Sequence, residues 1–224
     1  MVTPLTLKPG VTLWREYFTR TQQQALLADV LARVEEAPFY RPVMPKTGAP
    51  FSVDETNFGP LGWVSDHDGY RYDPRHPFTD KPWPAMPPAL LDLWASVADY
   101  PAPPECCLVN LYRAGAKMGL HQDREPAADA PVLSVSLGDD ALFRFGGDAR
   151  KGSTQSVKLS SGDVLAFGGP ARAMYHGIDR IVAGSSQLVP GGGRINLTLR
   201  RVTPKQNSTR SGGRPGAFYA PLRA

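Results

Sequence analysis

The chain of 224 residues is poor in cysteine and has no long hydrophobic run. Its two cysteines, Cys106 and Cys107, are adjacent, and sequence neighbours rarely form a disulfide with each other. This usage predicts a reducing compartment. The first residues, "MVTPLTLK", lack the charged start and apolar stretch of a signal peptide. No apolar run approaches the roughly 20 residues of a transmembrane helix. We therefore expect a soluble cytoplasmic protein without a membrane partner.

Most of the chain also lacks an excess of one charge sign. The net charge is +4, and the segment 203–224 accounts for it with four basic residues and no acidic one: Lys205, Arg210, Arg214 and Arg223. Residues 1–202 are formally neutral, so any surface for a polyanion must come from local placement of charge. The segment 203–224 is rich in Gly, Ser and Pro, and we expect a flexible basic tail.

Two helices are expected ahead of a series of short strands. The first spans residues 19–36, capped by Thr19 or Thr21, and its predicted apolar face is Leu26, Leu27, Val30, Leu31 and Val34. The second starts after Pro87 and Pro88, and its predicted apolar face is Leu90, Leu91, Trp94 and Val97.

Short strands with turn residues between them are predicted from residue 106 onward. They span residues 106–112, 132–138, 141–147, 154–160, 163–169, 173–178 and 195–202. Such spacing favours an all-β sandwich or barrel, with the preceding helices packed outside it. The chain length favours a single domain, which we expect to cover residues 1–202.

The segment "HQDRE" at residues 121–125 places ionisable groups inside an otherwise apolar stretch. In extended backbone, His121 and Asp123 share one face and Gln122 points away. The chain has four histidines, and His176 lies in the strand-like "AMYHGI", from which a barrel could bring it beside this pair. Two histidines and one carboxylate are typical of an Fe(II) site with open coordination positions. A buried His–Asp pair and a cupin-like zinc or manganese site are the alternatives.

The segment "RINLTLRR" predicts a strand with Arg194, Asn196, Thr198 and Arg200 on one face. Burying two unpaired arginines is costly. An anionic ligand would remove that cost, because arginine binds a carboxylate through two parallel hydrogen bonds. The alternative places this face in solvent and the three apolar residues between them in the core.

These motifs, in their order and spacing, resemble the bacterial AlkB family of dioxygenases, which use Fe(II), 2-oxoglutarate and O2 to dealkylate nucleic-acid bases. The matching segments are "GPLGWVSDHDGYRY", "DKPWPAMP", "NLYRAGAKMGLHQDRE", "PVLSVSLG", "FRFGG", "SGDVLAFGGPARAMYHGI" and "RINLTLR". The resemblance implies an α+β, mainly β fold. Its double-stranded β-helix (jelly-roll) core would cover residues 106–202, with N-terminal helices packed outside it. A nucleotide-recognition lid would cover residues 55–86.

The resemblance also implies roles for individual residues around the metal. His121, Asp123 and His176 would bind the iron. Arg194 would pair with the distal carboxylate of 2-oxoglutarate, and Asn110 and Tyr112 would support it. The end of 2-oxoglutarate that chelates iron would be held by Asn196 and Arg200.

A second set of implied residues would bind the substrate. Trp63 would stack on the flipped target base opposite the His121 ring, and Tyr70 and Tyr72 would line the same lid. The alternative for Trp63 is a place in the core. Phosphate contacts would come from Lys117, Arg124 and Arg150, for which simple solvated charge is the alternative.

One departure from the family pattern concerns Glu125. The family usually has an acidic residue two positions after the ligand aspartate, and this residue touches the target base. Glu125 stands at that place, Pro126 follows it, and the loop up to Pro131 is about one residue shorter than in familiar members. The resemblance implies that Glu125 contacts the substrate, but it leaves the preferred lesion open.

The function implied by the resemblance is oxidative dealkylation of bases of the 1-methyladenine and 3-methylcytosine type. The alkyl carbon would leave as formaldehyde and the base would be restored. Single-stranded DNA is the expected substrate, with double-stranded DNA and RNA as further candidates, and we expect a monomer. One alternative is a 2-oxoglutarate-dependent hydroxylase or demethylase of a protein or small molecule. A second is a non-catalytic binding module with a structural metal.

Overall fold

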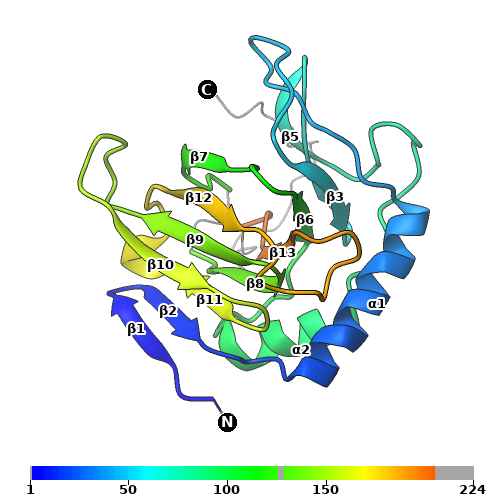
Figure 1. The fold of residues 1–224 in the computed structure, drawn as a ribbon. Helices are drawn as coiled ribbons and strands as arrows, with labels where there is room; N and C mark the ends of the chain where they lie inside the picture. Colours follow the sequence, from blue (N-terminus) through cyan, green and yellow to red (C-terminus); the bar gives the residue numbers. More distant parts are fainter. Residues whose placement is uncertain (1, 126–128, 205–224) are drawn as a thin grey trace, which may run out of the picture.

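The computed structural model describes residues 2–125 and 129–204. Within them, two antiparallel sheets face each other, and two α-helices lie together at one side of the molecule (Figure 1). The major sheet has seven strands in the order β1-β2-β11-β8-β13-β6-β3. The minor sheet has four strands in the order β10-β9-β12-β7, and β4 and β5 form a separate hairpin. The part of the tail beyond residue 204 lies outside the described residues.

The major sheet comprises β1 (Leu5–Lys8), β2 (Val11–Trp14), β3 (Asp54–Phe58), β6 (Cys106–Tyr112), β8 (Val132–Gly138), β11 (Val164–Phe167) and β13 (Arg194–Arg200). The minor sheet comprises β7 (Met118–His121), β9 (Asp140–Phe145), β10 (Gln155–Leu159) and β12 (His176–Val182). The hairpin comprises β4 (Gly62–Asp66) and β5 (Gly69–Asp73).

The core has two layers, one on each face of the major sheet. Between the sheets, Val132 and Phe167 pack with Phe143 and Ile178 of the minor sheet. On the outer face, the apolar sides of both helices pack against the same sheet, through residues that include Leu26, Val30, Leu90, Trp94, Val109, Val135 and Leu197. Strands that contribute to both layers are buried on both faces. This arrangement is a jelly-roll core with helices outside it, as the motif pattern predicted.

The first helix, α1 (Arg20–Glu36), begins where its capping residues are. The Thr19 hydroxyl accepts from the Gln22 amide, and the Gln22 side chain accepts from the Thr19 amide, which together form a capping box. The predicted Thr19 cap is therefore confirmed. Of the predicted apolar face, Leu26, Leu27 and Val30 are buried, while Leu31 and Val34 are partly buried.

In the second helix, α2 (Pro88–Val97), the predicted apolar face is wrong at one position. Leu91 is 39% exposed, whereas Leu93 is buried together with Leu90 and Trp94. Residues three and four apart share a helix face, so Leu93 and Trp94 continue the face that Leu90 begins. Leu91 points about 100° away from Leu90, toward solvent.

Other differences from the sequence-based expectation concern strands. The N-terminal strands β1 and β2 were not predicted, although Val11 and Leu13 alternate and are fully buried. The strand expected at 173–178 begins only at His176, because residues 169–173 form a 3-10 helix and a turn ahead of it, and the strand continues to Val182. None of the helices within the described residues is long and apolar enough to cross a membrane.

Candidate metal centre and cosubstrate site

Three side chains predicted as metal ligands converge in the structure. His121 ends β7 and His176 begins β12, and the two are paired across these neighbouring strands. Asp123 follows in the loop after β7. Nε2 of His121 lies 3.8 Å from Oδ1 of Asp123, and Nε2 of His176 lies 3.9 Å from Oδ2. One ligand atom from each residue lies within 4.8 Å of the other two, a spacing that one ion can bridge.

A glycine makes this convergence possible. Gly177 directly follows His176, and a Cβ at this position would lie 2.4 Å from the Met118 carbonyl oxygen. Only a residue without a side chain lets β12 lie this close to β7. The sequence pair His-Gly thus supplies both a ligand and the close approach to the strand that carries the other histidine.

Backbone contacts orient both imidazole rings. Nδ1 of His121 lies 2.9 Å from the Gly119 carbonyl oxygen, and Nδ1 of His176 lies 3.2 Å from that of Met174. An Nδ1–H that donates to a carbonyl leaves the Nε2 lone pair free for a metal. Both Nε2 atoms are also the ring atoms that approach Asp123.

The electrostatics of the site favour the forms that bind a metal. Burial, together with the charge of His121, lowers the pKa of His176 to about 4. Burial alone would raise the pKa of Asp123, but the Arg200 guanidinium and the two imidazoles outweigh it and hold this pKa well below its usual range. A metal ligand must be deprotonated, and both groups are so at neutral pH.

A buried cation with unused hydrogen-bond donors lies on β13, on the strand face that also carries Arg200, the partner of Asp123. Arg194 is 0% exposed, and its Nη2 donates to the Ser136 hydroxyl at 3.0 Å. Its Nε and Nη1 have no hydrogen-bond partner among the described residues, and neither does Oδ1 of Asn110. Strand register places Arg194 opposite Tyr112 and Asn196 opposite Asn110. These atoms fit a carboxylate ligand, which would accept from both free donors.

The predicted polar face of β13 points inward. Arg194, Asn196, Thr198 and Arg200 are all buried, so the alternative with this face in solvent is wrong. The Asn196 amide donates to the Ser134 hydroxyl at 2.8 Å and to the Val135 carbonyl at 2.9 Å. Arg200 instead binds the ligand aspartate, with Nη2 at 3.1 Å from each carboxylate oxygen of Asp123.

Comparison with known proteins identifies the family of this chain. Residues 10–200 match the model of the 2OG-Fe(II) oxygenase superfamily. The chain is 58% identical over 202 residues to an alpha-ketoglutarate-dependent dioxygenase AlkB homolog of Caulobacter vibrioides, covering 89% of this chain and 90% of the relative. It is 41% identical to the alpha-ketoglutarate-dependent dioxygenase AlkB of Escherichia coli, covering 89% and 94%. The chain belongs to the AlkB family.

A solved structure supports the same assignment. That of OsALKBH1 matches with a TM-score of 0.72 and 28% identity, covering 89% of this chain and 100% of the other. The chain is thus a dioxygenase of the AlkB family, and its cofactor and cosubstrates are Fe(II), 2-oxoglutarate and O2. The triad of ionisable ligands and the open donors of Arg194 fit the metal and the dicarboxylate.

The aromatic residues implied for substrate binding in this AlkB-family chain come from the β4–β5 hairpin. The Trp63 ring stacks on Tyr70, with centroids 5.6 Å apart and planes at 22°. The Trp63 backbone is held by the side chain of Asn57, through two hydrogen bonds of 3.0 Å. Trp63 and Tyr70 are half-buried. Tyr72 lies opposite Trp63 on β5 and is buried, and its hydroxyl donates to Oε1 of Glu125 at 2.6 Å.

Glu125 itself lies inside the protein. It is 6% exposed, and its carboxylate binds Tyr72, Arg172 and Arg200. These partners differ from the substrate contact that the family resemblance implies.

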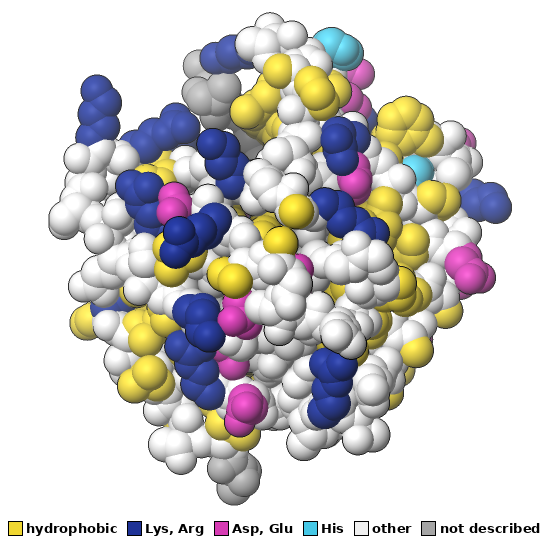
Figure 2. Space-filling model, viewed as in Figure 1, with side chains coloured by type: hydrophobic (Ala, Val, Ile, Leu, Met, Phe, Trp, Pro, Cys, Tyr) yellow, Lys and Arg dark blue, Asp and Glu magenta, His cyan; other side chains and the backbone are white. Residues whose placement is uncertain are grey.

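The implied phosphate contacts are exposed and come from three different loops. Lys117 precedes β7, Arg124 lies in the loop after it, and Arg150 lies between β9 and β10. Figure 2 shows Lys and Arg side chains gathered on the face where the minor sheet lies in Figure 1. Exposed or half-exposed cations on its strands and loops are Lys117, Arg144, Arg150, Lys151, Lys158 and Arg180. Such a face suits a polyanion.

Two residues near the site were not predicted from the sequence. Arg172 is buried and binds the loop that carries Asp123. Its position four residues before His176, inside a matching motif, is the feature that could have indicated it. Glu55 is buried on β3, opposite Asn110. The feature that could have indicated Glu55 is the presence of an acidic residue inside the strand segment "DETNF".

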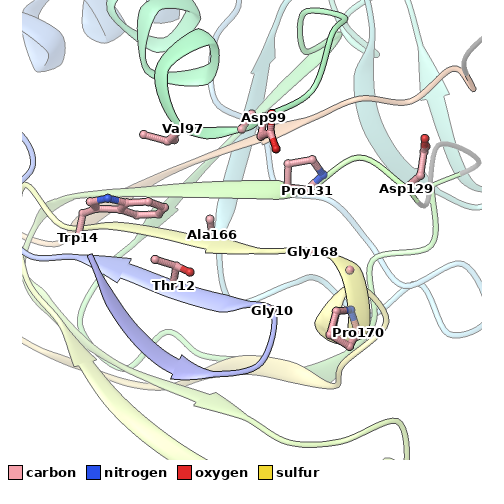
Figure 3. Close-up of a pocket in the computed structure, with 12 residues that line it drawn as sticks. Gly10, Thr12, Trp14, Val97, Asp99, Asp129, Pro131, Ala166, Gly168 and Pro170 are labelled. Atoms are coloured by element: carbon pink, nitrogen blue, oxygen red, sulfur yellow. The ribbon is translucent and has the colours of Figure 1, made fainter. Parts of the chain in front are cut away.

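A pocket of about 320 Å³ lies elsewhere, between the end of α2 and strands β2 and β11 (Figure 3). Trp14, Val97 and Ala166 are among its lining residues. Phe167, the neighbour of Ala166, contacts the His176 ring with centroids 4.7 Å apart. Because successive strand residues point to opposite faces, this pocket is on the far side of the major sheet from the metal centre.

Proposed function

We propose that the protein removes alkyl groups from N-alkylated bases of DNA, with 1-methyladenine and 3-methylcytosine as substrates. The observation that carries the proposal is the convergence of His121, Asp123 and His176, in a protein whose buried Arg194 has donors without a partner among the described residues. The bound iron and 2-oxoglutarate supply oxidation of the N-alkyl carbon by O2, after which that carbon leaves as formaldehyde and the base is restored.

The protein's own residues position the reactants. Arg194 binds the distal carboxylate of 2-oxoglutarate, with Tyr112 against the guanidinium, 5.5 Å from its carbon to the ring centroid. Asn196 follows two residues later on the same face of β13, and Asn110 lies opposite it on β6. The burial of these groups keeps water away, which strengthens their electrostatic hold on the cosubstrate. Release of formaldehyde requires no acid–base pair, and none is assigned.

The nucleotide lid in this proposal is the part of the expected segment 55–86 that follows β3, because residues 54–58 belong to the major sheet. Trp63 and Tyr70 form an aromatic platform on which a base extruded from the helix can stack. The exposed cations Lys117, Arg124 and Arg150 contact phosphates of a single-stranded substrate.

We further propose that residues 1–202 form one domain that acts as a monomer. A cytoplasmic location is consistent with the two buried free cysteines.

Mass spectrometry of a single-stranded oligonucleotide with one 1-methyladenine tests the function. The oligonucleotide is incubated with protein, Fe(II), ascorbate and O2, with and without 2-oxoglutarate. We expect loss of one methylene of mass only when 2-oxoglutarate is present. The His121→Ala variant should remove no methyl group. Succinate without demethylation would point to a protein or small-molecule substrate, and no succinate at all would contradict the metal assignment. An RNA oligonucleotide of the same sequence measures the preference between nucleic acids.

A further inference from the structure

Glu125 connects parts of the protein that are far apart in the sequence. Its Oε1 accepts a hydrogen bond of 2.6 Å from the hydroxyl of Tyr72 on β5, and Nε of Arg200 lies 3.4 Å from the same oxygen. Its other oxygen, Oε2, pairs with Nη2 of Arg172. Both carboxylate oxygens are thus engaged. The Glu125 side chain is only 4% exposed, so a base could reach this carboxylate only if the groups that cover it moved.

The two arginines lead from Glu125 to the metal ligand. Nη1 of Arg172 donates to the backbone carbonyl of Asp123 at 2.8 Å, and its Nε donates to the Ala130 carbonyl at 2.9 Å. Arg200 binds the side chain of the same aspartate through Nη2, at 3.1 Å from each oxygen. One guanidinium therefore fixes the backbone of Asp123, the other fixes its carboxylate, and Glu125 holds both guanidinium groups.

This support matters because Asp123 lies outside the regular strands. His121 is the last residue of β7, and the loop that follows it carries Asp123 without a strand ladder to hold it. The orientation of the ligand carboxylate depends on these side-chain contacts. Partners of this kind typically change metal affinity by about 10–100-fold when they are lost.

The charges of the cluster lead to the same conclusion. Asp123 and Glu125 each carry one negative charge, and Arg172 and Arg200 each carry one positive charge. The net charge of these four groups is therefore zero before a metal binds. Removing the charge of Glu125 leaves one excess positive charge beside the ligand carboxylate. That charge repels an incoming divalent cation and strengthens the competing hold of Arg200 on Asp123.

We propose that Glu125 is a positioning residue that couples the nucleotide lid, through Tyr72, to the iron ligand Asp123, and that it does not contact the target base. The proposal rests on the proposed function for the identity of the lid. It means that displacement of β5 is transmitted to the metal ligand through one buried carboxylate.

The test compares Glu125→Gln and Tyr72→Phe with Glu105→Gln as a matched control. Glu105 is also a carboxylate that binds an arginine, Arg201, at 3.2 Å, but its other contacts are with Val202 and Thr203. Metal-free protein is titrated with Co(II), and the visible absorption of bound cobalt is followed without any turnover. We expect Glu125→Gln to bind Co(II) about tenfold or more weakly. The Co(II) affinity of Tyr72→Phe and of Glu105→Gln should stay within about twofold of that of the unmodified protein. In both variants the contacts of Arg172 and Arg200 with Glu125 and Asp123 remain.

A second readout measures coupling, as succinate formed per formaldehyde released on a 1-methyladenine oligonucleotide. The ratio should rise in both Glu125→Gln and Tyr72→Phe and stay unchanged in Glu105→Gln. Unchanged Co(II) affinity and unchanged coupling in Glu125→Gln would overturn the proposal, whatever its melting temperature. Unchanged Co(II) affinity with an altered preference between 1-methyladenine and 3-methylcytosine would make Glu125 a base contact instead.

A variant that fails to fold does not block the test. Arg172→Lys keeps the positive charge but loses the forked geometry that reaches both Glu125 and the Asp123 carbonyl, and the same loss of Co(II) affinity is expected. If the unmodified protein demethylates no oligonucleotide, the proposed function fails while the cobalt titration still decides the role of Glu125.

Discussion

The Arg194 guanidinium lies over the Tyr112 ring, with its carbon 5.5 Å from the ring centroid, and holds two donors without a partner among the described residues. Burial lowers the pKa of Arg194 to about 10, so the group remains charged at neutral pH. A buried charge of this kind destabilises the protein until an anion binds it. Arg194→Met should therefore weaken 2-oxoglutarate binding while making the ligand-free protein no less stable.

The expected loss of affinity is large. A hydrogen bond to a charged group contributes about 1.5–3 kcal/mol, and losing two should raise the KM for 2-oxoglutarate at least about 100-fold. Succinate formation gives the KM, thermal unfolding of the metal-free protein gives the stability, and Co(II) affinity serves as the control that should not change. A KM close to that of the unmodified protein would remove Arg194 from the cosubstrate site.

Glu55 should make the stability of the protein depend on pH. It is 1% exposed, and its Oε2 has no hydrogen-bond partner within residues 2–125 and 129–204. Burial raises its pKa to about 8, with Arg200 opposing and Asp54 adding to the shift. Glu55 ionises at lower pH in the unfolded state than in the folded state. Its contribution to the stability of the folded protein is therefore fully present below about pH 4.5 and is lost as the pH rises toward 8.

Glu55→Gln removes this dependence because glutamine does not ionise. The stability of the variant relative to the unmodified protein should rise between pH 5 and pH 8, by an amount on the order of a few kcal/mol. Urea unfolding of the metal-free proteins at several pH values measures it, and Glu105→Gln is the control. A stability difference that stays constant across this range would show that Glu55 is already ionised in the folded protein.

Local patterns in the sequence predicted the parts of the site that lie on one strand or in one motif. The alternation in "RINLTLR" placed Arg194 and Arg200 on one face, and the structure buries both. The spacing in "HQDRE" predicted that His121 and Asp123 converge, which the structure confirms. In these cases a period of two residues fixes which side chains lie together.

Contacts between distant segments could not be predicted in this way. The partners of Glu125 come from 53 and 47 residues away, on β5 and just before β12. A local pattern carries no information on such pairs. The N-terminal strands show the same limit, since β2 is recognisable as a sheet strand mainly through its pairing with β11, where Leu13 lies opposite Leu165.

Trp63→Ala should weaken nucleic-acid binding without affecting the metal centre. Stacking of a base on an aromatic ring contributes about 1–3 kcal/mol, so the Kd for a 1-methyladenine oligonucleotide should rise about 5–150-fold. Fluorescence anisotropy measures this Kd, and Co(II) titration checks the metal site. Phe78→Ala is the control, because Phe78 is an aromatic of the same segment, 75% exposed, that packs against Tyr40. Equal Kd values for the two variants would exclude Trp63 from base stacking.

The basic tail should add affinity for nucleic acid that depends on salt. Deleting residues 205–224 removes Lys205, Arg210, Arg214 and Arg223. The preceding backbone remains anchored, because Glu105 accepts from the amides of Val202 and Thr203. Each phosphate contact on a single strand contributes about 0.7 to the slope of log K against log salt, so the slope should fall by up to about 3.

The loss of affinity on tail deletion should be greatest at low salt, and anisotropy over a range of salt concentrations measures it. A full-length variant with the four basic residues replaced by glutamine separates charge from chain length, and it should behave as the deletion does.

If the full-length protein and the deletion gave parallel salt dependences, the tail would make no phosphate contacts, and the polyanion affinity would come from the basic face over the minor sheet. In that case, charge reversal at Arg150 or Lys158 should reduce the slope instead, because both side chains are exposed on that face.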